Sequence, residues 1–501
     1  MAAPEAHPAK RPTYGNWRRP QSSGLGSLGL GVTMILFSGL ILVVLATLVS
    51  LGLALVLVLL LALVLVPMIV KDRHGRTVLT RIGGNLAWRQ SVSAGSNLYR
   101  SGPLGRTGHG TCTLPGLAAG SELTEAQDAY GRPFALLTYP STGHHVAVLT
   151  CEADGAGLVD NEQVDQWVAH WGQWLAGLGS EPGIVGASVT VETAPDTGIR
   201  LAQEVRSNLA EDAPDLAKAM YADVLKDYPA GSARISTRIA LTYSGAARAG
   251  HPRRDAGDMA VLIGNRLPGL SSTLAMTGAG PARPMTAVEL AEAVRVAYDP
   301  TVAPLIEEAS HNGGSGLTWA DAGPVGADES KTAYSHDGSY SVTWCMADAP
   351  RGAVQSSVFT GLVSPSDDIA RKRVTILYRP HDPASATRVV QSDKAHAQFR
   401  AAQQKREKAR DTAALRAATQ TEEEEASGAG VVRFSLLVTA TVTSREDLPR
   451  AEAAMDNLSG PARIALRKVT SAQASAFAAA LPIGLVLPHH LTVPSTVRDY
   501  L

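Results

Sequence analysis

The longest feature of the hydrophobic pattern is a stretch without charge. No residue between Arg19 and Lys71 is charged, and Leu, Val, Gly and Ala dominate residues 25–70. A helix that crosses about 30 Å of hydrocarbon needs about 20 residues, so this stretch is long enough for two passes and too long for one tilted helix. A signal peptide has a shorter apolar core of about 7 to 15 residues. The pattern predicts a transmembrane helical hairpin over residues 25–70, with its turn near residues 47–52.

Basic residues flank this hairpin on both sides. Positive charge is retained on the cytoplasmic side, and two passes return the chain to the side it left. We therefore expect the N-terminal segment, residues 1–24, and everything after residue 70 to be cytoplasmic. The flanking basic residues are Lys10, Arg11, Arg18 and Arg19 before the hairpin and Lys71, Arg73, Arg76, Arg81 and Arg89 after it.

Beyond the hairpin, the pattern changes to that of a globular protein. Residues 71–132 are rich in glycine and proline and are predicted to form a loop-rich connector. Short apolar runs then alternate with amphipathic stretches, and the flexible residues 311–316 separate two α+β domains, 133–310 and 311–501. Many connections are too short for parallel crossovers, so the predicted fold is one of small antiparallel sheets with helices on one face. The two domains are similar in the order of their elements only.

The individual elements follow from periodicity. Within residues 161–178, apolar residues recur at spacings of three and four, a stripe typical of a buried helix face: Val164, Trp167, Val168, Trp171, Trp174 and Leu175. Thr286 and Glu289 have the spacing of a capping box. Strands are predicted at 134–139, 146–151, 185–192, 235–243, 341–345, 374–378, 431–443 and 463–469, and helices at 161–178, 196–225 with a break at 212–214, 259–267, 286–297, 384–426, 448–458 and 471–481.

The predicted helix over residues 384–426 has an unusual charge distribution. It is basic over residues 403–410 and ends in the acidic run Glu422–Glu425, and its apolar positions are mostly alanine. Such a helix buries little apolar surface. Two interpretations stay open: a solvated arm, and a docking arm for a partner of complementary charge.

Charge and cysteine content limit the function classes. The 501 residues include 45 Lys and Arg and 46 Asp and Glu, a net charge of -1. The chain lacks the basic surplus that neutralises phosphates, so we expect no direct contact with nucleic acid. The three cysteines are widely spaced and odd in number, which fits a reducing compartment and indicates neither a disulfide framework nor a zinc site.

Candidate catalytic groups are few. The sequence has no Walker loop (GxxxxGK[ST]), no GxGxxG between a strand and a helix, no HExxH and no GxSxG. The pairs His144–His145 and His489–His490 are adjacent and cannot chelate a metal from one helix face. Cys345 lies in an apolar strand, and the acidic residues Asp160, Glu162 and Asp165 suit a helix N-terminus. We predict no catalytic, cofactor-binding or metal-binding residue, no cofactor, and no enzymatic activity.

The C-terminal quarter has a familiar order of motifs. The run Arg373–Pro383 reads as a strand that enters a proline turn and a helix, and residues 428–484 combine an apolar strand, a helix from Leu448, and the sequence Leu-Pro-Ile-Gly at 481–484. This order resembles the N-terminal, non-motor domain of the conjugative type IV secretion traffic ATPases. In that family a motor with a Walker loop follows. No such loop occurs here, so the resemblance carries over no ATP hydrolysis and no catalytic residue.

The N-terminal region has a second resemblance, which extends over nearly the whole chain. Tyr14–Pro20, Asp72–Arg76 and Tyr99–Pro103 are similar to segments of a family of integral membrane proteins carried on integrative conjugative elements of Gram-positive bacteria. The hairpin itself resembles the small two-helix inner-membrane subunit that accompanies, or is fused to, the traffic ATPase.

These resemblances imply a function. We expect a non-catalytic component of a conjugative secretion apparatus, anchored in the bacterial inner membrane, which docks a separate P-loop motor ATPase and other subunits and is oligomeric within that complex. One alternative is the E-type component of a type VII secretion core, which also follows two helices with a cytoplasmic domain. Another is a membrane-bound hydrolase, which would need a cleft with convergent titratable groups.

Overall fold

The structure is a computed structural model, which describes residues 12–15, 17, 30–70, 77–105, 107–153, 155, 157–210, 212–227, 232–247, 252–350, 352–402 and 409–491. Internal contacts divide the chain into two units. The first, here called the body, comprises residues 1–16, 98–381 and 430–490. The second, here called the helical unit, comprises residues 17–97, 382–429 and 491–501.

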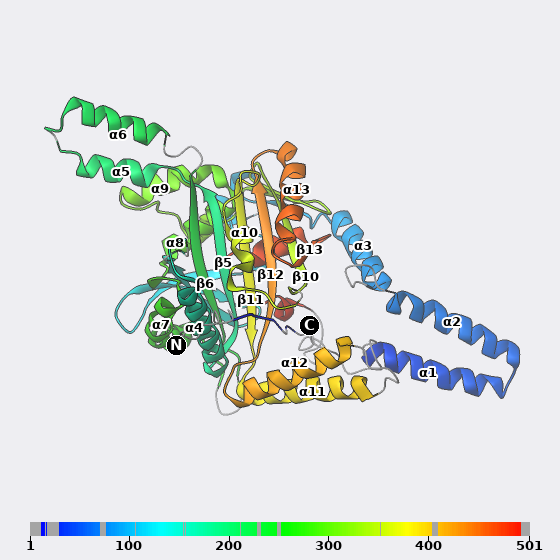
Figure 1. Ribbon diagram of the computed structural model, residues 1–501. Coiled ribbons are helices and arrows are strands. Elements are labelled where there is room, and N and C mark those ends of the chain that lie inside the picture. Colours follow the sequence, from blue (N-terminus) through cyan, green and yellow to red (C-terminus); the bar gives the residue numbers. More distant parts are fainter. Residues whose placement is uncertain are drawn as a thin grey trace, which may run out of the picture. The chain divides into compact units, whose positions relative to one another are not determined.

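The helical unit contains the apolar stretch as two helices joined by a tight turn (Figure 1). They are α1 (Leu30–Thr47) and α2 (Leu51–Ile69), and the side chain of Ser50 caps α2 by accepting from the amide of Leu53. A Cβ at Gly39 would lie 2.4 Å from a methyl of Leu61, so glycine permits the close packing of α1 on α2. Among the described helices, α2 is long and apolar enough to cross a membrane, whereas the apolar part of α1, Val32–Thr47, is shorter.

The flanking basic residues are only partly covered by the structure. Arg81 and Arg89 belong to a further helix, α3 (Val78–Ser93), which Thr77 caps. This helix was not expected, since residues 71–132 had been predicted to form loops. Lys10, Arg11, Arg18, Arg19, Lys71, Arg73 and Arg76 lie outside the described residues.

The predicted long charged helix is instead a pair of helices, so that prediction is wrong. α11 (Pro383–Ala402) packs along α12 (Ala409–Ala426), and most of the basic run, residues 403–408, lies outside the described residues. The alanines explain the difference, because small side chains such as Ala397 and Ala418 are buried where the two helices meet. Part of the acidic run is used within the pair: Glu422 forms an ion pair with Lys394, and Glu425 accepts from Thr387 at 2.8 Å.

The body is built on one antiparallel sheet of 13 strands (Figure 1). The order is β2-β3-β4-β6-β5-β11-β12-β10-β9-β8-β1, with β7 beside β4 and β13 beside β10. The α+β class and the antiparallel pairing are as predicted, but the strands of the described ranges form one large sheet instead of separate small ones. The strands are β1 Leu98–Arg100, β2 Glu122–Gln127, β3 Pro133–Tyr139, β4 His144–Cys151, β5 Ile184–Pro195, β6 Ala233–Ser244, β7 Ala282–Pro284, β8 Gly326–Glu329, β9 Tyr334–His336, β10 Ser339–Asp348, β11 Arg371–Pro380, β12 Val432–Val442 and β13 Ala465–Lys468.

The sheet consists of two equivalent halves that meet at one pair of strands. From the outside inward, the strand order β2-β3-β4-β6-β5 repeats as β8-β9-β10-β12-β11, and β7 corresponds to β13. The halves join where β5 pairs with β11, over Ala187–Thr193 and Lys372–Tyr378. We call this junction the seam. The expected boundary at residues 310–311 therefore separates two halves of one sheet, and the similarity in element order is confirmed.

The helices also correspond between the halves. α4 corresponds to α10, the hairpin α5–α6 to α11–α12, α7 to α13, and α8 to α14, while α9 lies between the halves in sequence. The bounds are α4 Asn161–Ser180, α5 Ile199–Asn208, α6 Asp215–Asp227, α7 Ala256–Leu274, α8 Ala287–Tyr298, α9 Ala303–His311, α10 Thr360–Val363, α13 Leu448–Ser459 and α14 Gln473–Ala479.

Helices cover both faces of the sheet, not one face as predicted. On one face, α4 and α7 pack over the first half, with Trp174 and Ile263 buried, and α10 and α13 pack over the second half. On the other face, α8, α14 and residues 481–485 enclose a core that contains Leu290 and Phe477. In the predicted tryptophan stripe, Trp174 is buried and the half-buried Trp171 packs against the same core, and Thr286 and Glu289 form the predicted capping box.

A candidate functional site at the seam

Polar side chains line the seam on the face that α14 covers. Alternate residues of a strand share a face, so Arg371, Arg373 and Thr375 lie on this face while Lys372 points to the other. The hydroxyls of Thr190 and Thr375 lie 3.2 Å apart across the seam. Farther into the second half, two more hydroxyl pairs continue the row: Thr343 with Thr439 at 3.0 Å and Ser341 with Thr441 at 2.7 Å.

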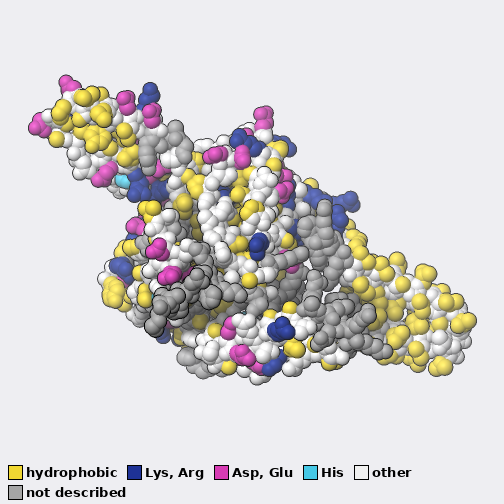
Figure 2. Space-filling model, viewed as in Figure 1, with side chains coloured by type: hydrophobic (Ala, Val, Ile, Leu, Met, Phe, Trp, Pro, Cys, Tyr) yellow, Lys and Arg dark blue, Asp and Glu magenta, His cyan; other side chains and the backbone are white. Residues whose placement is uncertain are grey.

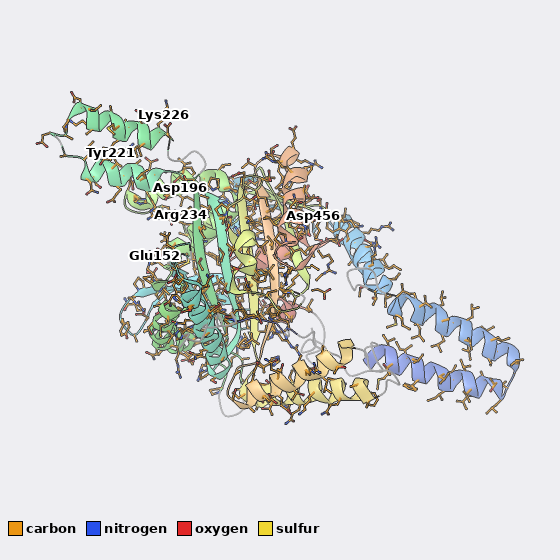
Figure 3. The ribbon with its side chains drawn as sticks, viewed as in Figure 1. Glu152, Asp196, Tyr221, Lys226, Arg234 and Asp456 are labelled. Atoms are coloured by element: carbon orange, nitrogen blue, oxygen red, sulfur yellow. The ribbon has the colours of Figure 1, made fainter. Side chains whose placement is uncertain are left out.

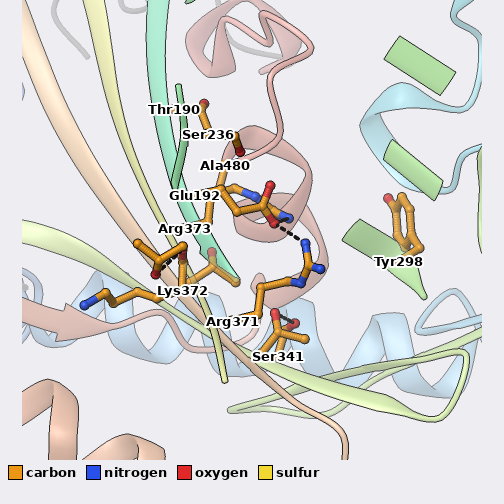
Figure 4. Close-up of polar contacts among 12 residues, drawn as sticks. Thr190, Glu192, Ser236, Tyr298, Ser341, Arg371, Lys372, Arg373 and Ala480 are labelled. Atoms are coloured by element: carbon orange, nitrogen blue, oxygen red, sulfur yellow. Dashed lines mark hydrogen bonds and ion pairs between the residues drawn. The ribbon is translucent and has the colours of Figure 1, made fainter. Parts of the chain in front are cut away.

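Glu192 is the centre of a buried charged cluster on this face (Figure 4). Its Oε1 accepts from Nη1 of Arg371 at 2.8 Å and from Nη2 of Arg373 at 3.1 Å, both on β11 across the seam. Its Oε2 accepts from Nη1 of Arg238 on β6 at 3.2 Å. The side chains of Glu192 and Arg373 are only 6% and 2% exposed, so water screens this contact little. One carboxylate thus joins the two halves of the sheet.

The cluster contains more positive than negative charge. Burial alone would raise the pKa of Glu192, but the charges of Arg373, Arg371 and Arg238 outweigh burial and hold that pKa well below its usual range. Glu192 is therefore ionised at physiological pH and is unsuited to carry a proton. The guanidinium of Arg373 also lies 5.5 Å from the ring centre of Phe477, whose π face attracts a cation. Within the described residues, nothing accepts from Nε or Nη1 of Arg373.

A second ion pair lies near the solvent-exposed end of the same strands (Figure 3). Arg234 on β6 contacts Glu307 on α9 at 3.0 Å, and Glu307 also accepts from the hydroxyl of Thr197, just before α5. Gly198 follows with φ +72°, and its amide donates to Asp196 at 2.9 Å. These contacts fix the base of the α5–α6 hairpin to the strands that form the cluster.

The two histidine pairs are far apart in the sequence but meet in the body. The rings of His144 on β4 and His489 lie 4.9 Å apart, and His490 contacts Tyr139 edge-on. Burial, together with the neighbouring imidazoles, lowers the pKa of His144 to about 3. Across the described ranges, no group of three or more potential ligands could hold a metal ion.

A third buried histidine lies beside the hydroxyl row. His336 on β9 shares a hydrogen bond of 2.8 Å with Ser341, and its other ring nitrogen contacts the carbonyl of Tyr298. Burial lowers its pKa to about 4. Both nitrogens are thus engaged by partners that suit a neutral ring.

Comparison with known proteins gives little to add to this geometry. A family model described as a domain of unknown function (DUF8461) matches residues 21–80. This range includes α1 and α2 and none of the seam. No curated protein matches the chain.

The other candidate residues stay apart from the cluster. Cys345 on β10 is half-buried and accepts from Arg467 at 3.3 Å. Asp160 and Glu162 lie at the start of α4, as predicted, and Asp165 accepts from the hydroxyl of Tyr14 at 3.4 Å.

The charged cluster is not among the predicted sites. A usable signal was present, because Arg371 and Arg373 are two residues apart at the start of an apolar strand and must share a face. The partner Glu192 is about 180 residues away and shows no such pattern.

Proposed function

We propose that the protein is a non-catalytic, membrane-anchored structural component of a conjugative, type IV-like secretion apparatus, and that it docks a separate P-loop motor ATPase. One observation carries this proposal: each half of the sheet inserts a helical hairpin, α5–α6 or α11–α12, between its two seam-side strands. Helices inserted between hairpin-paired strands contribute little to the sheet and present their own surfaces to partners. A sheet whose two halves each carry such an insert in the chain suits contact with other subunits.

The central charged cluster supports a structural role. A general acid or base needs a pKa near the operating pH, whereas Glu192 is held ionised by three guanidiniums. The contacts of Glu192 join strands of the two halves, and a rigid junction of this kind keeps a scaffold in one shape.

The apolar helices supply the proposed anchor. Most side chains of α2 are apolar and exposed, as Leu55, Leu59 and Leu63 illustrate. At 1.5 Å per residue, the 18 residues of α1 and the 19 of α2 extend roughly 27 and 29 Å, close to the thickness of the hydrocarbon core. We infer that both helices cross the inner membrane and that both termini are cytoplasmic.

Reporter fusions test this topology. Alkaline phosphatase fused after Leu501 should be inactive, because it stays in the cytoplasm, and a fluorescent protein at the same place should fluoresce. A phosphatase fusion placed between α1 and α2, at residue 49, is the matched positive control and should be active. Phosphatase activity at the C-terminal fusion would mean an odd number of passes and would contradict the hairpin.

Co-purification tests the docking of a motor. The exposed glutamates of α12, Glu423 and Glu424, are the targets, because Glu422 and Glu425 contact α11, whereas Glu424 accepts from Gln420 of its own helix at 2.8 Å. The variant E423K/E424K should reduce capture of the motor encoded nearby at low salt, since charge assists orientation and on-rate. Capture is measured from detergent-solubilised membranes.

The matched control is E446K/D447K, which reverses two exposed adjacent acids of the body just before α13. Equal capture by both variants and the wild type would contradict docking through α12. Capture of a type VII motor instead would favour the E-type component.

A further inference from the structure

The α3 helix presents an apolar stripe to solvent. The stripe occupies about 100° of the circumference over the first half of the helix. Its members are Val78, Leu79, Ile82 and Leu86, and they are 38–59% exposed. The opposite face is small or polar, with Thr80, Gly84, Ala87 and Ser91. No residue of α3 is buried, so within the described residues nothing covers the stripe.

The start of α3 lies at the end of the apolar helix α2. The amide of Val78 donates to the carbonyl of Val70, the residue that caps the C-terminus of α2, at 3.2 Å. Figure 1 shows α3 following α2, and Figure 2 shows hydrophobic side chains over the visible surface of α1 and α2. In the proposed function α2 crosses the membrane, so its end reaches the layer of lipid headgroups. The stripe therefore begins at the level of the headgroups, and this step rests on the proposed function.

The charge of this region is one-sided. Residues 73–121 contain six arginines and no lysine, aspartate or glutamate, although the whole chain has a net charge of -1. Two of these arginines belong to α3: Arg89 continues the line of the stripe, about 20° from Ile82, and Arg81 borders it, about 60° from Val78. In the described part of the chain, neither arginine pairs with a carboxylate.

We propose that α3 is an interfacial helix. Its stripe enters the headgroup boundary of the leaflet that α2 leaves, and Arg81 and Arg89 bind the phosphates of anionic phospholipids there. Apolar and basic side chains on one helix are typical of helices that lie at a membrane surface. An arginine stem follows apolar surface while its guanidinium reaches a polar layer, which suits the place of Arg89 on the line of the stripe.

Other occupants suit the stripe less well. A second copy of α3 has the same positive charge and no negative charge, so two copies repel each other. A nucleic acid offers phosphates but no apolar layer for the stripe. A surface of anionic lipid offers both an apolar layer and negative charge, and α2 already brings α3 to it.

Quenching by labelled lipid, measured on the full chain in vesicles, tests the contact. A fluorophore on I82C should be quenched by nitroxide-labelled phosphatidylcholine at least about threefold more than one on A87C, because only position 82 lies on the stripe. A87C is the matched control, since Ala87 is exposed on the same helix about 140° away from Ile82. The wild-type chain, labelled in the same way, gives the background from Cys112, Cys151 and Cys345.

Two results overturn the contact with lipid. One is equal quenching at positions 82 and 87. The other is a fluorophore at position 82 that is shielded from iodide in the water but not quenched by the labelled lipid, because a protein partner then covers the stripe.

Two vesicle compositions test the role of charge. Phosphatidylglycerol added to the phosphatidylcholine should raise the quenching at I82C roughly twofold, because anionic lipids attract the arginines. R81Q/R89Q in the I82C chain should remove this rise, and the matched control R200Q/R206Q, at two exposed arginines of α5, should keep it. No rise with phosphatidylglycerol, or a rise that R81Q/R89Q leaves intact, overturns the binding of anionic headgroups.

Alkaline extraction of the same vesicles separates this proposal from the membrane anchor on which it rests. A chain that alkali does not release, but whose position 82 is no more quenched than position 87, refutes the interfacial helix alone. A chain that alkali releases refutes the anchor formed by α1 and α2, and the interfacial helix with it.

Discussion

At the scale of single residues, Glu192 has the largest expected effect on stability. Its carboxylate is shared by three guanidiniums from both sides of the seam, and nothing else in the described part of the body has an equal set of contacts. Removing the carboxylate of a buried ion pair leaves the positive charge of its partner buried and uncompensated. This loss of stability is larger than the stability that the intact pair contributes.

The variant E192Q should therefore lower the free energy of unfolding by about 3–5 kcal/mol. The matched control is D368N, which breaks the exposed pair between Asp368 and Arg450 and should cost no more than about 1 kcal/mol. Urea unfolding of the full chain in detergent measures both. Adding R373M to E192Q should recover part of the loss, because it removes one of the uncompensated charges. Equal losses for E192Q and D368N would show that the cluster is not a stabilising junction.

At the scale of elements, local patterns were predicted well and distant pairings were not. The hairpin of β3 and β4, the tryptophan stripe of α4 and the capped start of α8 were correct, because each depends on residues close in sequence. The alanine-rich stretch was predicted to form one helix, because periodicity does not reveal where a helix pair reverses. The edge strand β1 has three residues and β2 is mostly polar, so neither has a strand pattern.

In the candidate site, too, the local pattern could be predicted and the distant pairing could not. The sequence places Arg371 and Arg373 on one face of one strand, but only the pairing of β5 with β11 brings Glu192 to them. The same holds for His144 and His489, which are adjacent in space through the path of the C-terminal segment.

At the scale of the whole molecule, the buried histidines make stability depend on pH. The pKa of His144 is lowered to about 3 and that of His336 to about 4, below the ordinary value of about 6.5 in an unfolded chain. Below pH 6.5 the unfolded state binds protons that the folded state does not. The two neutral histidines therefore leave the free energy of unfolding at its full value above pH 6.5. That stability is lost as the pH falls toward 4 and then 3.

Each histidine should cost about 2 kcal/mol of unfolding free energy at pH 5 relative to neutral pH. Unfolding in urea across pH 7 to 4.5 measures the slope. The variants H144N and H336N should each reduce that slope by about one proton. A slope that H144N does not change would mean that His144 is charged in the folded body.

The path of residues 481–486 has a consequence for synthesis on the ribosome. The carbonyls of Ile483 and Gly484 accept from Tyr139 at 2.8 Å and Thr242 at 2.7 Å, both in the first half of the sheet. Between Tyr298, which ends the last helix of that half, and this segment, the ribosome translates for roughly 10 to 40 s at 5–20 residues per second. During that interval the nascent first half exposes the apolar face that these residues later cover, so this face is the natural target of a chaperone that meets the chain before translation ends.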